Sequence, residues 1–184
     1  MISHILDRQT THTTHTFKVQ QVNVRLPDGR THPYDLVDHN PAVTIVPIDS
    51  RGEVWFVRQF RVGAEGDLLE LPAGVLNPGE EPLAAAAREI REEIGQAAGR
   101  LQKIGEFYMA AGYCNEFMHV FLAADLRPDP LKADADEFIQ AESIPVQQVY
   151  EMVARGQLRD SKSLASLLLA LPYLTENPQL KQSV

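Results

Sequence analysis

The stretch "GVLNPGEEPLAAAAREIREEIGQ", residues 74–96, crowds five glutamates into the fourteen positions from Glu80 to Glu93. Pro82 suits the first position of a helix, where its missing N–H breaks no hydrogen bond. The run of alanine, glutamate and arginine that follows favours a helix, and Gly95 is typical of a residue that ends one. The segment therefore predicts a loop, a helix and a second loop.

Three glutamates of the predicted helix gather on one side of it. With 100° per residue, Glu89 and Glu93 lie about 40° apart, and Glu92 widens the arc to roughly 100°. Like charges four residues apart destabilise a helix by a few tenths of a kcal/mol. Arg88 is placed to pair with Glu92, one turn away. An acidic face exposed to solvent is one interpretation of this pattern.

A metal site is the second interpretation. An apolar stripe facing the core is predicted at the neighbouring positions Leu83, Ala87, Ile90 and Ile94. Carboxylates at the edge of such a stripe repel one another unless a cation lies between them, and oxygen ligands suit Mg²⁺ or Mn²⁺. The crowding is explained if this helix holds a metal ion.

The composition excludes several classes of protein. With 184 residues and 44% apolar content, the chain can bury one ordinary core. The net charge of −8, without a lysine or arginine run, argues against binding to nucleic acid or to an anionic membrane. No apolar run is long enough to span a bilayer, and no signal-peptide pattern is present, so we expect a cytoplasmic protein. Cys114 is the single cysteine, which excludes an internal disulfide.

The rest of the chain reads as strands, then the helix, then strands, then helices. The first residues, with His12 and His15, are expected to form a mobile terminus. This order predicts an α/β fold of the α+β sandwich type, with a mixed sheet between helices and an N-terminal antiparallel β segment. Strands are expected over residues 16–26, 31–39, 42–48, 53–62, 101–110 and 117–126, and two late helices over 146–156 and 161–171.

Residues 74–96 resemble the signature of the Nudix hydrolases. That signature reads Gly, five residues, Glu, seven residues, Arg-Glu-aliphatic, one residue, Glu-Glu, one residue, Gly-aliphatic. The corresponding positions are Gly74, Glu80, Arg88, Glu89, Ile90, Glu92, Glu93, Gly95 and Gln96. Gln96 alone departs from the pattern, at a packing position of the family.

The resemblance implies the Nudix fold and the hydrolysis of a nucleoside diphosphate linked to another moiety. It implies that Glu89, Glu93 and the backbone carbonyl of Ala73 bind Mg²⁺ or Mn²⁺, and that Glu92 takes a supporting catalytic role. The ions would neutralise the pyrophosphate and lower the pKa of an attacking water. A structural role is implied for the remaining matched residues, namely Gly74 at a sharp turn, Glu80, Arg88 and Gly95.

Upstream, "RQFRVGAEGDLLELPAG" resembles the branch of ADP-ribose and nucleotide-sugar pyrophosphatases. This resemblance implies that Arg58, Arg61 and Glu70 bind substrate. An arginine fork matches phosphate oxygens, so Arg61 is a candidate for a phosphate or the terminal ribose. The alternatives are an exposed strand residue for Arg61 and an ion pair between strands for Glu70.

Downstream, "YMAAGYCNE" occupies the place of a loop that reads Ser-Pro-Gly and then Glu in the ADP-ribose branch. Gly112 matches the glycine, and Glu116 matches the glutamate that is the favoured general base. Ala111 stands where the branch has proline. The later segment from Asp136-Glu137 onward also resembles the branch.

The leading hypothesis is a Mg²⁺-dependent enzyme that cleaves ADP-ribose to AMP and ribose 5-phosphate. Ala111 motivates the same reaction on another nucleotide sugar, such as GDP-mannose, as the alternative. A Nudix domain that senses a nucleotide without catalysis is a further alternative. The resemblance also implies a homodimer, in which residues 1–40 form a dimerising β extension and residues 41–184 form the Nudix domain.

Overall fold

The computed structural model describes residues 2–132 and 138–175. Contacts within the chain divide it into two compact units. The N-terminal unit contains the residues up to Pro41 together with Phe107–Phe117, and the sandwich unit contains Ala42–Glu106 and the residues from Met118 onward. The Asp136-Glu137 pair lies outside the described residues. Within the described part, no helix is long and apolar enough to cross a membrane.

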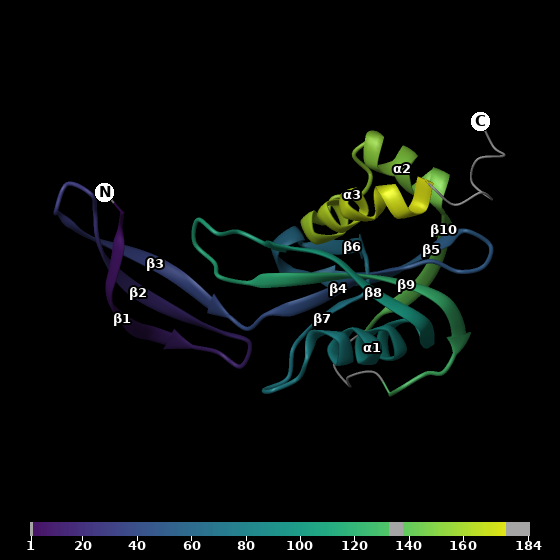
Figure 1. The fold of residues 1–184 in the computed structure, drawn as a ribbon, viewed down its shortest axis with the longest axis horizontal. Coiled ribbons are helices and arrows are strands. Elements are labelled where there is room, and N and C mark those ends of the chain that lie inside the picture. Colours follow the sequence, from purple (N-terminus) through teal and green to yellow (C-terminus); the bar gives the residue numbers. More distant parts are fainter. Residues whose placement is uncertain (1, 133–137, 176–184) are drawn as a thin grey trace. The chain divides into compact units, whose positions relative to one another are not determined.

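The N-terminal unit contains an antiparallel sheet in the order β1-β2-β3 (Figure 1). Its strands are β1 (His4–Thr13), β2 (Phe17–Arg25) and β3 (Thr31–His39). Gly29, with a φ of +87°, makes the turn between β2 and β3, a conformation that glycine adopts without strain. The expectation of a mobile terminus is wrong for His12, because this residue pairs with Val19 in the sheet.

The sandwich unit contains a mixed sheet and a smaller antiparallel sheet. Strand β4 pairs in parallel with β9 and antiparallel with β7, and β5 lies between β10 and β6. The mixed sheet comprises β4 (Ala42–Pro47), β7 (Ala73–Val75), β8 (Gln96–Tyr108) and β9 (Phe117–Pro128). The antiparallel sheet comprises β5 (Glu53–Arg61), β6 (Gly66–Glu70) and β10 (Gln140–Pro145), with a short 3-10 helix, η1 (Val62–Ala64), between β5 and β6.

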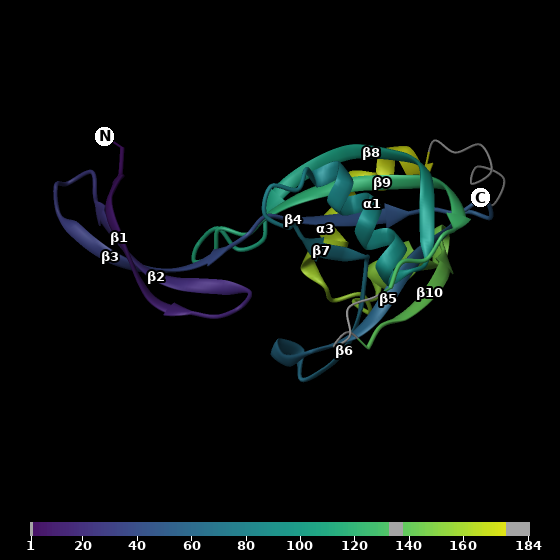
Figure 2. The same cartoon turned by 90° about the horizontal axis from the view of Figure 1, so that it is seen from below.

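Helices cover both faces of these sheets. Helix α1 (Pro82–Glu93) lies on one face, and α2 (Val146–Ala154) and α3 (Ser161–Thr175) lie on the other, as Figures 1 and 2 show. Side chains alternate along β4: Val43 and Ile45 pack with the α1 side, whereas Val46 packs with the α2 and α3 side. This alternation divides the core into two layers, and it confirms the predicted sheet between helices.

All six expected strands and both late helices are present, but β1, β6, β7 and β10 were not predicted. These strands are short or polar, and they exist because neighbouring strands pair with them rather than because of their own sequence pattern. The predicted apolar stripe of α1 is wrong at Leu83, which is 53% exposed, while Ala85 and Ala86 are fully buried instead.

Candidate active site

Helix α1 buries two of its glutamates together with its apolar residues. Pro82 occupies its first turn, and Gly95, with a φ of +68°, follows its end, as the sequence predicted. Glu89 is 8% exposed and Glu93 is 9% exposed, and Ile90 between them is fully buried. The interpretation as a solvent-exposed acidic face is therefore wrong for this pair, and burial of two carboxylates requires specific partners.

The guanidinium of Arg88 donates hydrogen bonds to three glutamates, Glu80, Glu89 and Glu92. It donates from Nε and Nη2 to Glu80, at 2.9 Å each, and from Nη1 to Glu89 at 2.6 Å and to Glu92 at 2.9 Å. It also donates from Nη2 to the Val75 carbonyl at 3.3 Å. The expected pair with Glu92 is present, but Arg88 also ties the helix to the preceding loop through Glu80.

The pKa of Glu80 is lowered to about 2, mainly because Arg88 donates hydrogen bonds to its carboxylate. Burial opposes this shift, and the backbone N–H of Asn77, at 2.9 Å, supports it. Because the folded pKa lies below the ordinary value of 4.5, the ionised Glu80 stabilises the folded state above about pH 4.5, and this stabilisation is lost as the pH falls toward 2.

Glu80→Gln is therefore expected to lower the free energy of unfolding at pH 7, and the difference from the wild type should shrink as the pH falls from 5 to 3. Urea unfolding at pH 7, 5 and 3 measures this. Glu81→Gln, at the exposed neighbouring position, serves as the matched control. A difference between Glu80→Gln and the wild type that stays constant over this pH range would contradict the assignment.

The carboxylates of Glu89 and Glu93 lie against the backbone of strand β7. The Ala73 N–H donates to Glu93 Oε2 at 3.0 Å. A Cβ added at Gly74 would overlap the carboxylate of Glu89. Gly74 lies in β7 and has no positive φ, so glycine is required here by this close approach and not by the sharp turn that was expected.

The chemistry of this cradle fits a hard divalent cation. The carboxylates of Glu89 and Glu93 and the backbone of Ala73 offer oxygen donors, which Mg²⁺ and Mn²⁺ prefer. In residues 2–132 and 138–175, no group of three or more His, Cys, Asp or Glu side chains is arranged to hold a metal ion. The metal ligands therefore stay a prediction, which rests on the donor types and on the space that Gly74 leaves for Glu89.

Arg61, which is partly exposed, forms an ion pair with the buried Glu70 between β5 and β6. Arg61 donates from Nε to Oε1 and from Nη2 to Oε2 of Glu70, at 2.8 Å each, and Glu70 is only 1% exposed. Burial alone would raise the pKa of Glu70, but the hydrogen bonds from Arg61 and the charge of Lys162 outweigh it, so this pKa is lowered. The alternative of an inter-strand ion pair for Glu70 is thus the geometry that the structure has.

Arg61 also interacts electrostatically with Glu93 of helix α1. Its pKa is raised, mainly by the hydrogen bonds to Glu70, and the charge of Glu93 adds to the shift against the effect of burial. Arg61 therefore lies within electrostatic range of a predicted metal ligand. A cation in this place suits an anionic group bound near Glu93.

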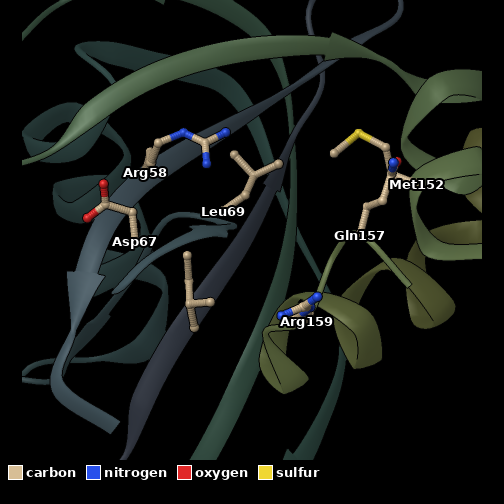
Figure 3. Close-up of a pocket in the computed structure, with 7 residues that line it drawn as sticks. Arg58, Asp67, Leu69, Met152, Gln157 and Arg159 are labelled. Atoms are coloured by element: carbon tan, nitrogen blue, oxygen red, sulfur yellow. The ribbon is translucent and has the colours of Figure 1, made fainter. Parts of the chain in front are cut away.

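Arg58 lies on the opposite face of β5. It pairs in register with Leu69, whereas Val57 pairs with Glu70, and side chains three positions apart on a strand point to opposite faces. Arg58 donates to Glu142 at 2.7 Å and lines a hollow of about 320 Å³, across which Met152, Gln157 and Arg159 lie (Figure 3). The structure thus separates Arg58 from Arg61, and substrate binding by Arg58 stays a prediction.

Gly112 and Glu116 belong to the N-terminal unit. Glu116 is paired through its backbone with Met109, and its Oε1 lies 3.9 Å from His39 Nδ1. No atom would meet a Cβ added at Gly112 within 4 Å, so its local packing does not require glycine. The roles of Glu116 as general base and of Gly112 in substrate binding stay predictions.

Three residues at the start of α3 contact the site but were not predicted from the sequence: Asp160, Lys162 and Ser163. Lys162 Nζ contacts both Glu70 and Asp160. The signal available was the run "DSKS" before an apolar stretch, which is typical of a helix N-cap. That pattern predicts the start of the helix, but it says nothing about the distant Glu70.

The family model described as NUDIX domain matches residues 38–167. The chain belongs to the Nudix family. This confirms the family resemblance that residues 74–96 carry. The match covers α1 and β7, so the buried glutamate pair and its backbone cradle lie inside the Nudix domain.

Relatives and a solved structure agree with this membership. The Nudix chain is 34% identical to the ADP-ribose pyrophosphatase of Bacillus subtilis, over 88% of this chain and 84% of the relative. It is 32% identical to a GDP-mannose pyrophosphatase of Escherichia coli, over 78% of each. A crystal structure of an ADP compounds hydrolase superposes with a TM-score of 0.86 at 26% identity, covering 97% of both chains, which confirms the predicted Nudix fold.

Proposed function

We propose that this protein is a Mg²⁺-dependent pyrophosphatase that hydrolyses ADP-ribose to AMP and ribose 5-phosphate. The observation that carries the proposal is the buried pair Glu89 and Glu93, set against the backbone of Ala73 and Gly74 inside a Nudix domain. The similarity to the Bacillus subtilis enzyme supports the choice of ADP-ribose.

Each residue has a proposed role in this reaction. Bound Mg²⁺ supplies neutralisation of the pyrophosphate and activation of water, and Glu89, Glu93 and the Ala73 carbonyl would hold it. Glu92 acts as a supporting metal ligand or orients the water, and Arg88 Nη1 holds its carboxylate by donating to Oε2 at 2.9 Å. Arg61 binds a phosphate or the terminal ribose, since a guanidinium matches phosphate oxygens. Glu116 accepts the proton of the attacking water as general base.

Another nucleotide sugar is the second candidate substrate. Ala111 replaces the proline of the ADP-ribose branch, and the similarity to a GDP-mannose pyrophosphatase supports this candidate as well. A sensor without catalysis is disfavoured, because such a domain does not need to keep two carboxylates buried at a cost in desolvation.

The experiment offers the purified protein ADP-ribose, GDP-mannose, UDP-glucose and NADH with Mg²⁺ and compares kcat/KM values. We expect ADP-ribose to be preferred, with AMP and ribose 5-phosphate as products. In Glu116→Gln, kcat should fall by about 10²-fold, the lower range of general-base catalysis, with little change in KM. Preference for GDP-mannose would select the second candidate, and no turnover of any of the four would overturn the proposed function.

We also propose that the N-terminal β extension, residues 1–40, dimerises the protein. An apolar hollow of about 400 Å³ in the N-terminal unit supports this, with Ile5, Val22, Tyr34 and Leu36 in its lining. Exposed apolar surface of this kind marks interaction sites. The molar mass of the purified protein in solution, measured by light scattering, tests the dimer. The cytoplasmic location stays a prediction.

A further inference from the structure

The first turn of α3 is fastened to the strand that carries Glu70. The Leu71 N–H donates to Ser163 Oγ at 2.7 Å, and Ser163, fully buried, donates in turn to Asp160 Oδ2 at 2.5 Å. The same Asp160 oxygen accepts the Ser163 N–H at 2.9 Å, which caps the helix. The start of α3 and the end of β6 are therefore held in one geometry.

Lys162 lies inside this junction rather than in solvent. Its side chain is 11% exposed, and its Nζ contacts Glu70 Oε2 and lies 3.0 Å from Asp160 Oδ2. Taking an ammonium and two carboxylates out of water is unfavourable, and replacement of a whole buried ion-pair cluster by apolar residues is often neutral or stabilising, although removal of one partner alone leaves an uncompensated charge. A buried lysine here is better explained by the geometry it imposes than by stability.

Glu70 connects Lys162 to Arg61. Its Oε2 accepts from Arg61 Nη2 at 2.8 Å and also contacts Lys162 Nζ, so two cations fix one carboxylate. Arg61 donates to Glu70 from Nε and Nη2. A guanidinium has five N–H donors, and the Arg61 side chain is 41% exposed. Donors of Arg61 remain for an anion, and Glu70 decides where they lie.

We propose that Lys162 is a positioning residue for the pyrophosphate of the substrate: by fixing the carboxylate of Glu70, it holds the guanidinium of Arg61 where phosphate oxygens bind beside the Glu93 site. This rests on the proposed function, because it takes the site of Glu93 as the place of the pyrophosphate. Glu70, which holds Arg61, lies three residues before Ala73, and the Ala73 N–H donates to Glu93 Oε2 at 3.0 Å, so one short segment positions both Arg61 and Glu93. Lys162 acts through Glu70 and does not touch the substrate.

Lys162→Met is expected to raise KM about tenfold and to leave kcat within about twofold, the effect of losing one charge-assisted hydrogen bond in binding. Lys162→Arg keeps the cation and should stay close to the wild type. Glu70→Gln should raise KM by a similar factor. Because Lys162 acts through Glu70, the double variant should be no worse than either single variant. Lys103→Met, at an exposed lysine paired with Glu106, is the matched control and should change neither constant.

A binding measurement separates this inference from the proposed function. Calorimetry with inorganic pyrophosphate and Ca²⁺ should show about tenfold weaker binding to Lys162→Met than to the wild type. This readout holds even if the wild type hydrolyses none of the nucleotide sugars, which would overturn the function alone. If Lys162→Met does not fold, the same pyrophosphate binding is compared between Lys162→Arg and the double variant that combines Lys162→Met with Glu70→Gln.

Three results would overturn the inference. In the first, Lys162→Met binds pyrophosphate as tightly as the wild type, which would make Lys162 purely structural. In the second, the effects of Lys162→Met and Glu70→Gln multiply in the double variant, which would mean that Lys162 acts without Glu70. In the third, Lys162→Met lowers kcat while KM is unchanged, which would place Lys162 in the chemical step.

Discussion

Glu93→Gln is expected to lower kcat/KM for ADP-ribose by about 10³-fold or more, because a metal ligand supports several kcal/mol of transition-state stabilisation. The amide keeps the shape of the side chain and can still accept the Ala73 N–H, which donates to Glu93 Oε2 at 3.0 Å. The loss should therefore appear in turnover and not in the fold.

Steady-state kinetics at saturating Mg²⁺, together with thermal unfolding, measure both effects. Glu81→Gln is the matched control, since Glu81 stands at the start of the same helix and is exposed. Its kinetic constants should equal those of the wild type. A Glu93→Gln protein that keeps its unfolding temperature and more than about a tenth of its activity would contradict a metal-binding role, because a tenfold loss is only about 1.4 kcal/mol.

Gly74→Ala is expected to lower kcat/KM by about 10²-fold, since a displacement of a catalytic group by about 1 Å costs that much. The added methyl group would overlap the carboxylate of Glu89, which must then leave its cradle and its bond to Arg88. Because Gly74 has no positive φ, the backbone itself accepts alanine, so the effect isolates the position of Glu89.

The same kinetic assay, repeated over a Mg²⁺ titration, measures the effect of Gly74→Ala. This variant should need a higher Mg²⁺ concentration than the wild type for half-maximal activity. Gly63→Ala is the matched control, because nothing lies within 4 Å of its Cβ position and its φ is not positive. Activity of Gly74→Ala equal to that of Gly63→Ala would show that Glu89 need not stay where the structure has it.

The sequence predicts the helix and its chemistry well because both are local. Fixed spacing puts Glu89 and Glu93 on one side of α1, and proline and glycine signals mark its ends. The exact buried face is less predictable: Leu83 fits the helical period but is exposed, because the sheet under α1 contacts Ala86 and Ile90 instead. Tertiary packing decides which side of a helix is buried.

Contacts between distant residues are the part that the sequence does not predict. Lys162 and Glu70 are 92 positions apart, and they meet because the first turn of α3 is hydrogen-bonded to Leu71, directly after β6. Likewise, the reason for glycine at position 74 is the carboxylate of Glu89, fifteen residues later, and no local pattern reports that approach. Arg58 and Arg61 look equivalent in one strand, yet the alternation of the strand sends them to opposite faces.

Binding of Mn²⁺ tests most directly whether the crowded glutamates form a metal site. Electron paramagnetic resonance of free Mn²⁺, titrated with protein, gives the dissociation constant for the wild type and for the variant with both Glu89→Gln and Glu93→Gln. We expect the wild type to bind Mn²⁺ and the double variant to bind at least about 10²-fold more weakly, because two carboxylate ligands are lost. Equal Mn²⁺ binding by the two folded proteins would show that Glu89 and Glu93 are not metal ligands.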